Sequence, residues 1–121
     1  MRDSPIIGAN AEQFAINWLK RSGFTIIAHN FRGRWGEIDI IGTKLCTIVF
    51  CEVKSRKSSR YGSSAASVSR KKQGKIAMTA QQFLNQHPEY RNHAKRFDVI
   101  ALGDQRRWIE GAFSVEDLIL S

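Results

Sequence analysis

Apolar residues recur at intervals of three and four in two stretches of the chain, which is the spacing that places them on one face of a helix. The first stretch has Ser4 and Pro5 as its starting signals and ends before Gly23. The second covers about residues 65–86, and Pro88 follows it. We predict a helix for each stretch.

Shorter runs rich in β-branched and aromatic residues predict strands. Two of them, residues 37–41 and 46–54, are separated by a short turn and should pair antiparallel as a hairpin. Residues 29–35 predict a basic, aromatic connector, residues 55–64 a polar loop and residues 115–120 a short terminal helix. The other predicted strands are residues 24–28, 97–102 and 107–110.

This order of elements is not interrupted by a linker, a repeat or a low-complexity tract, so we expect a single domain over residues 1–121. A chain of 121 residues with 42% hydrophobic composition can bury one core. The simplest assembly of these elements is an α/β fold in which helices flank a central sheet.

Positive charge changes this picture, because 19 Lys and Arg against 11 Asp and Glu leave a formal net charge of +8. Such a charge would attract a polyanion, and nucleic acid is the first candidate. The alternative is a basic surface that only aids solubility. Charge alone does not separate these two interpretations.

Cys46 and Cys51 form neither a disulfide framework nor part of a zinc pattern, and we interpret both as buried thiols. The chain shows no signal peptide pattern and no apolar run long enough to span a membrane. We therefore expect a reducing, cytoplasmic location and no membrane partner.

Candidate chemistry lies on the hairpin, where side chains should alternate between the two faces of each strand. In the first strand Glu37 and Asp39 would share one face, and Ile38 and Ile40 the other. A strand with two acidic residues on one face is a candidate for a site.

The second strand would carry Glu52 and Lys54 together on one face, and the hairpin can bring Asp39 beside Glu52. Mg²⁺ would remove the repulsion between these carboxylates, since it binds oxygen ligands and commonly uses one or two carboxylates plus substrate phosphate. Lys54 could then position a water or offset charge on the phosphate. The opposite face would hold Val49, Cys51 and Val53.

Two helical residues lean toward this site. Glu12 lies at the edge of the first apolar stripe, and Lys72 interrupts the apolar row of the second between Val68 and Ile76. Each has an alternative as a snorkelling or ion-paired side chain. The strand residues likewise have an alternative as a structural cluster of salt bridges.

A basic rim around the site is predicted from cationic residues near the strands and the second helix. Trp35 and Tyr61 could stack on exposed bases, although we expect Trp35 to pack in the core. Asp98, inside a predicted strand, is expected to pair with a nearby Arg. The cations of the rim are Arg32, Arg34, Arg56, Lys57, Arg60, Arg70, Lys71 and Lys75.

The run Gly-Glu-Ile-Asp at residues 36–39, followed by Phe-Cys-Glu-Val-Lys-Ser-Arg at residues 50–56, resembles the signature of the PD-(D/E)XK nuclease superfamily. More narrowly, the whole chain resembles the YraN-like family of predicted endonucleases. The other matching segments are Asn-Phe-Arg at 30–32, Val68 with Lys72 and Gln73, Arg-Phe-Asp-Val at 96–99, and Ala-Phe at 112–113. The hairpin turn departs from the family, in which an Asp-Gly type turn is common.

The resemblance implies a restriction-endonuclease-like core with a central mixed sheet, similar to archaeal Holliday-junction resolvases. It implies that Asp39, Glu52 and the carbonyl of Val53 bind metal and that Lys54 is the catalytic lysine. It also implies that Glu12 is the helix carboxylate and that Lys72 or Gln73 supports the site.

Together these observations predict a Mg²⁺- or Mn²⁺-dependent endonuclease that acts on DNA rather than RNA, with branched or structured DNA as a candidate substrate. A resolvase would need two active sites, so a homodimer is expected for that substrate. The alternatives are a non-catalytic nucleic-acid-binding module with a nuclease-like fold and a metal-free structural protein.

Overall fold

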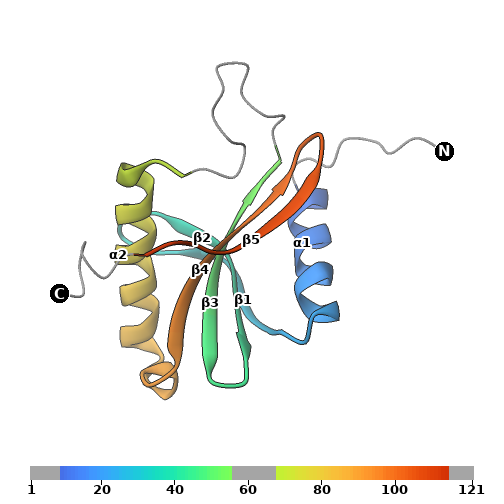
Figure 1. The fold of residues 1–121 in the computed structure, drawn as a ribbon. Helices are drawn as coiled ribbons and strands as arrows, with labels where there is room; N and C mark the ends of the chain where they lie inside the picture. The colour runs from blue at the N-terminus through green and yellow to red at the C-terminus, as the bar shows by residue number, and fades with distance from the viewer. Residues whose placement is uncertain (1–8, 56–67, 115–121) are drawn as a thin grey trace.

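The protein is described by a computed structural model over residues 9–55 and 68–114 (Figure 1). Its elements, in chain order, are α1 (Ala9–Arg21), β1 (Thr25–Arg32), β2 (Glu37–Lys44), β3 (Thr47–Lys54), α2 (Arg70–Gln86), the 3-10 turn η1 (Pro88–Tyr90), β4 (Ala94–Leu102) and β5 (Arg106–Phe113). No helix in these two ranges is long and apolar enough to span a membrane.

The five strands form one sheet in the order β1-β2-β3-β4-β5. Neighbouring strands are antiparallel except β3 and β4, which are parallel. A parallel pair needs a long crossover, and the connection containing α2 supplies it. This arrangement confirms the predicted α/β class with a central mixed sheet flanked by helices, the architecture expected of a restriction-endonuclease-like core.

The two larger hydrophobic cores lie on opposite faces of the sheet, one under each long helix (Figure 1). The α1 core joins residues such as Leu19 to Ile40 and Val49, and the α2 core joins residues such as Phe83 to Phe50. Because β2 and β3 are covered on both faces, they contain consecutive buried residues rather than a simple alternation.

Several boundaries differ from the sequence prediction. Residues 29–32, predicted as part of a connector, continue β1 because they pair with β2 from Ile40 to Glu37. The hairpin turn contains only Leu45 and Cys46, since the strands pair as far as Lys44 and Thr47. α2 begins after the cap Ser69, whose hydroxyl accepts a hydrogen bond from the backbone N–H of Lys72.

Burial of two side chains was predicted wrongly. Cys51 is buried, but Cys46 is exposed because it lies in the hairpin turn. Trp35 is 49% exposed rather than packed in the core, because the connection between β1 and β2 lies at the surface. The predicted starting signals Ser4 and Pro5, the polar loop from residue 56 to residue 64 and the terminal helix lie outside the described residues.

Candidate active site

The hairpin strands β2 and β3 separate at the position of the two candidate metal ligands. Their pairing runs from Lys44 opposite Thr47 to Ile40 opposite Cys51, so the next positions are Asp39 and Glu52. There the Asp39 side chain takes the place of a backbone partner: its Oδ2 accepts a hydrogen bond of 2.8 Å from the N–H of Val53. The carboxylate therefore lies in the fork between the strands.

The predicted alternation along β2 fails at this fork. Ile38 packs in the core beneath α2, whereas Ile40 packs in the core beneath α1, so the two do not share a face. Strict alternation holds only where a strand remains regular, and β2 leaves the hairpin ladder between these residues, at Asp39. In β3 the prediction is confirmed for the opposite face, since Val49, Cys51 and Val53 all pack with the α1 core.

Four carboxyl groups from three elements contribute to the electrostatics of the fork. Burial, followed by the negative charge of Glu52, raises the pKa of Asp39 from 3.8 to about 7. The Val53 N–H opposes this rise, while Glu12 on α1 and Glu37 on β2 add to it. The fold thus gathers acidic residues at one point and makes the charged form of Asp39 costly.

Glu52 has a cationic partner from the other helix. The Nζ of Lys72, in the first turn of α2, lies 3.0 Å from Glu52 Oε2, and the Glu52 side chain is only 12% exposed. The hydrogen bond to Glu52 raises the pKa of Lys72, so this lysine stays charged. The lysine that interrupts the apolar row of α2 is therefore ion-paired to the candidate site.

Two further candidates for catalysis lie at the end of β3 and on α2. Lys54 is half-buried at the end of β3, two residues after Glu52. The side-chain amide of Gln73 donates a 2.8 Å hydrogen bond to the carbonyl of Val68 and so holds the chain that enters α2. The catalytic roles of Lys54, Lys72, Gln73 and Glu12, and the metal contact of the Val53 carbonyl, stay predictions.

The donor set of the fork can be compared with the needs of a metal ion. Within residues 9–55 and 68–114, no three His, Cys, Asp or Glu side chains form a group that could hold a metal ion. Asp39 and Glu52 nevertheless supply two hard oxygen ligands, and Mg²⁺ commonly completes its shell with water and substrate phosphate. The residues present fit a site shared between protein and substrate rather than a closed protein cage.

The described part of the predicted basic rim is exposed. Arg32 makes a long contact to Glu37, 3.9 Å between Nε and Oε2, and its side chain is 83% exposed. The rim residues on β1, in the connection after it and on α2 are Arg32, Arg34, Arg70, Lys71 and Lys75. Three others, Arg56, Lys57 and Arg60, lie outside the described residues, as does Tyr61.

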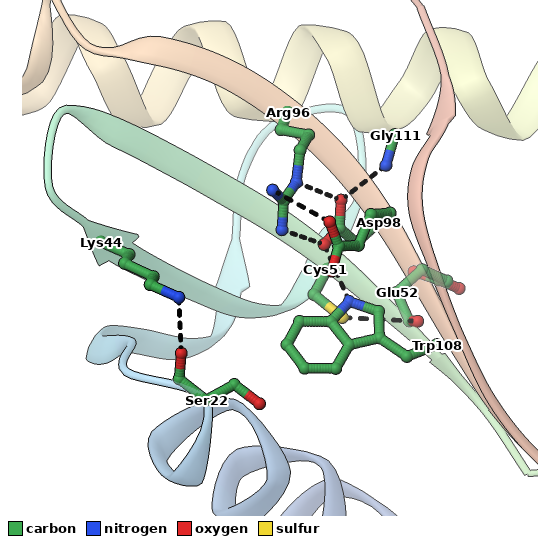
Figure 2. A network of polar contacts seen from close by, with 9 residues as sticks. Ser22, Lys44, Cys51, Glu52, Arg96, Asp98, Trp108 and Gly111 are labelled. Atoms are coloured by element: carbon green, nitrogen blue, oxygen red, sulfur yellow. Dashed lines mark hydrogen bonds and ion pairs between the residues drawn. The ribbon is translucent and has the colours of Figure 1, made fainter.

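Asp98, on β4, belongs to a separate network that includes Trp108, a residue packed on the α1 side of the sheet (Figure 2). The Asp98 side chain is fully buried and pairs with Arg96 through contacts of 2.9 and 2.8 Å, as predicted. The structure adds two donors that sequence reasoning missed, the indole N–H of Trp108 and the backbone N–H of Gly111, each at 2.9 Å. Four donor contacts identify Asp98 as a structural carboxylate that joins β4 to β5.

Comparison with known sequences gives a family. A profile described as "Uncharacterised protein family UPF0102" matches residues 11–102, which cover α1 from its third residue, the hairpin, α2 and β4. The chain belongs to this family. The resemblance to YraN-like proteins that the sequence motifs predicted is thereby confirmed.

Members of the UPF0102 family from several bacteria are similar over nearly the whole chain. One from Aeromonas hydrophila is 44% identical over 112 residues, covering 91% of this chain and 86% of the relative. Another from Alcanivorax borkumensis is 38% identical and covers 96% of this chain and 98% of the relative. Both are named only as UPF0102 proteins, so their names do not indicate an activity.

Among solved structures, a repair endonuclease from Pyrococcus abyssi is similar with a TM-score of 0.42 and 17% sequence identity. The match covers 97% of this chain but only 45% of the endonuclease, so the chain spans less than half the length of that protein. At this level of similarity the pair supports no conclusion about activity or substrate.

Proposed function

We propose that this UPF0102 protein is a metal-dependent endonuclease that hydrolyses phosphodiester bonds in DNA. The observation that supports the proposal is the strand fork, where Asp39 lies in the field of Glu52 and its pKa is raised to about 7. A divalent cation bound by both carboxylates would reverse this penalty. The proposal therefore gives a physical reason for an otherwise unfavourable arrangement.

In the proposed site Asp39 and Glu52 hold Mg²⁺ or Mn²⁺, which when bound supplies an activated water and neutralises phosphate charge. Asp39 is oriented by the N–H of Val53, and Glu52 by the ammonium of Lys72. Lys54, at the end of β3, would position the attacking water or stabilise the developing phosphate charge. The exposed cations would bind the flanking phosphates.

A cleavage assay with matched charge variants tests the proposal. With Mg²⁺ or Mn²⁺, the wild type should cut DNA, while Asp39→Asn, Glu52→Gln and Lys54→Met should each lose at least about a hundredfold in rate. Glu89→Gln, which removes a carboxylate from the exposed turn η1, should cut like the wild type. The substrate preference is measured by comparing cleavage rates on four-way junction, flap, single-stranded, blunt duplex and RNA substrates. Branched DNA is expected to be cut fastest.

Metal binding provides a second readout that does not require cleavage. A calorimetric titration with Mn²⁺ should detect binding to the wild type. Asp39→Asn and Glu52→Gln should lower the Mn²⁺ affinity, and Glu89→Gln should leave it unchanged. Equal binding by all four proteins would contradict the proposed ligands, and a wild type that binds Mn²⁺ but cuts none of the substrates would contradict the proposed activity.

A second candidate function is a nucleic-acid-binding module without catalysis. The ion pair between Lys72 and Glu52 favours it, because it gives Glu52 a counter-charge without metal. This alternative predicts that nucleic acid binds equally well to the wild type and to Asp39→Asn, and that neither cuts. A homodimer and a cytoplasmic location stay predictions, and sedimentation with and without junction DNA would test the dimer.

A further inference from the structure

The connection between β1 and β2 holds an exposed aromatic ring on a fixed backbone. The N–H of Gly33 donates to the carbonyl of Gly36 at 2.8 Å and closes the turn around Arg34 and Trp35. The N–H of Arg34 donates to the side-chain carbonyl of Gln82 on α2, also at 2.8 Å. The turn is therefore tied to a helix rather than supported by its own residues alone.

Close packing confirms that this turn lies directly on α2. A Cβ added at Gly33 would come within 2.5 Å of Gln82 Oε1 and 3.1 Å of Thr79 Cγ2. At Gly36 the nearest atoms would be Thr79 Oγ1 and the Cβ of Lys75, at 3.7 and 3.8 Å. The backbone is thus fitted against the helix on both sides of Trp35.

Trp35 itself remains exposed despite this support. Its exposed fraction is 49%, and the described residues contain just one other large exposed hydrophobic side chain, Leu45 in the hairpin turn. The guanidinium of Arg34 lies 5.9 Å from the centre of the Trp35 ring, and exposed Arg32 and Lys75 lie on the elements beside the turn. An exposed indole among cations matches a ligand with both flat rings and negative charge.

The turn also has a defined position relative to the candidate active site. Lys72, which pairs with Glu52, precedes Lys75 and Thr79 on one face of α2, since the intervals are three and four residues. A rise of 1.5 Å per residue places Thr79 about 10 Å beyond Lys72. This distance corresponds to a few nucleotides of a strand at about 3.4 Å each.

We propose that Trp35 is a stacking platform for an unpaired base, a few nucleotides from the phosphate at the Asp39–Glu52 fork. Bases in an intact duplex are already stacked on one another, so such a platform selects strands with unpaired nucleotides, as in single strands, flaps and junctions. The inference rests on the proposed nucleic-acid function but does not require cleavage, since stacking uses neither Asp39 nor Glu52.

Binding measured in EDTA separates this inference from the nuclease proposal. The probes are fluorescein-labelled DNAs of about 12 nucleotides: a single strand, a blunt duplex and a duplex with a short single-stranded flap. Trp35→Ala should lower the affinity for the single strand and for the flap duplex about tenfold, and the affinity for the blunt duplex less than twofold. Trp35→Phe should retain most of the affinity, and Leu45→Ala, which removes the other exposed hydrophobic side chain, should leave all three unchanged.

Salt dependence distinguishes stacking from phosphate binding. Trp35→Ala should leave the slope of log affinity against log salt unchanged, whereas Lys75→Gln should reduce it by about one. The inference would be overturned if Trp35→Ala lost affinity equally for all three probes or for none of them. It would also be overturned if Trp35→Phe bound the probes as weakly as Trp35→Ala. If Asp39→Asn keeps the Trp35-dependent preference while no protein cuts, stacking stands and the nuclease proposal fails.

Discussion

At the scale of single residues, the main feature is a carboxylate held in an unfavourable place. Asp39 is partly buried, accepts one backbone hydrogen bond and lies in the field of three other acidic residues. The hydrogen bond favours its charged form, but burial and repulsion outweigh that bond, and the net effect is the raised pKa. Such shifts are common at functional sites, where the cost is offset when a ligand binds.

Stability should therefore depend on pH through Asp39. Because its pKa is 3.8 in an unfolded chain and about 7 in the folded protein, the folded state binds more protons between these values, and this contribution to stability falls as pH rises through that window. In EDTA, Asp39→Asn should be more stable than the wild type above pH 7 and lose this advantage toward pH 4.

Thermal unfolding of both proteins from pH 4 to pH 8 measures this effect. Glu89→Gln serves as the control and should follow the wild type. Addition of Mn²⁺ at pH 8 should raise the melting temperature of the wild type but not that of Asp39→Asn. If the melting temperatures of the wild type and Asp39→Asn changed with pH in parallel, Asp39 would not be the source of the pH-dependent stability.

At the scale of elements, the β2–β3 hairpin brings together the two carboxylates, but one residue of its turn, Leu45, is poorly suited to the backbone conformation there. Leu45 has a φ of +55°, in the left-handed region that favours Gly or Asn, and its side chain is 91% exposed. Leu at such a position costs roughly 1 kcal/mol of strain. The turn lies at the opposite end of the hairpin from the fork, so it can be changed without altering the site.

Leu45→Gly should raise the free energy of unfolding by about 0.5–1 kcal/mol, because Gly adopts this backbone without the clash of a Cβ. Asn30→Gly is the matched comparison: its φ is +53°, but Asn already tolerates this region, so the gain should be smaller. Urea denaturation of both variants measures the difference. A larger gain at Asn30 would contradict the strain assigned to Leu45.

The junction of β4 and β5 depends on the buried Asp98 (Figure 2). Asp98→Asn should destabilise the protein by about 3 kcal/mol, because it leaves Arg96 without its charged partner. The NH2 group of the new amide would also face N–H donors where the carboxylate accepted their hydrogen bonds. Glu110→Gln is the control: it removes the second, 62% exposed partner of Arg96 and should cost less than about 1 kcal/mol. Urea denaturation would refute this assignment if the two losses were equal.

At the scale of the whole molecule, a net charge of +8 accompanies a concentrated acidic fork. The described cations of the rim lie on β1, in the connection after it and on α2, whereas the carboxylates of the fork lie on α1, β2 and β3. This separation suits a polyanion whose flanking phosphates are bound by the rim while one phosphate lies at the fork.

Affinity for duplex DNA in EDTA should therefore fall about a hundredfold between 50 and 200 mM salt, as expected for a few phosphate contacts. Lys71→Gln should reduce the salt slope by about one. Lys95→Gln is the control, because its ammonium donates to the carbonyls of Arg91 and His93 away from the rim, and it should leave the slope unchanged. Fluorescence anisotropy measures each slope, and a salt-independent affinity would exclude the proposed rim.

The sequence by itself determined the features that depend on local patterns. Helical spacing identified both helices, and strand propensity located the hairpin, because these signals extend only over a few neighbouring residues. Alternation also assigned the α1-facing residues of β3 correctly, since β3 keeps a regular pleat. The motif residues gave the family, which the profile match confirmed.

Only the tertiary structure decided how distant segments meet. It set the fork that breaks the alternation at Asp39, the contact between Lys72 and Glu52, and the donors that surround Asp98. It also left Trp35 exposed on α2, because a turn that packs through its glycines leaves no room beneath it for the ring. These outcomes depend on contacts between residues far apart in the chain, which local periodicity does not record.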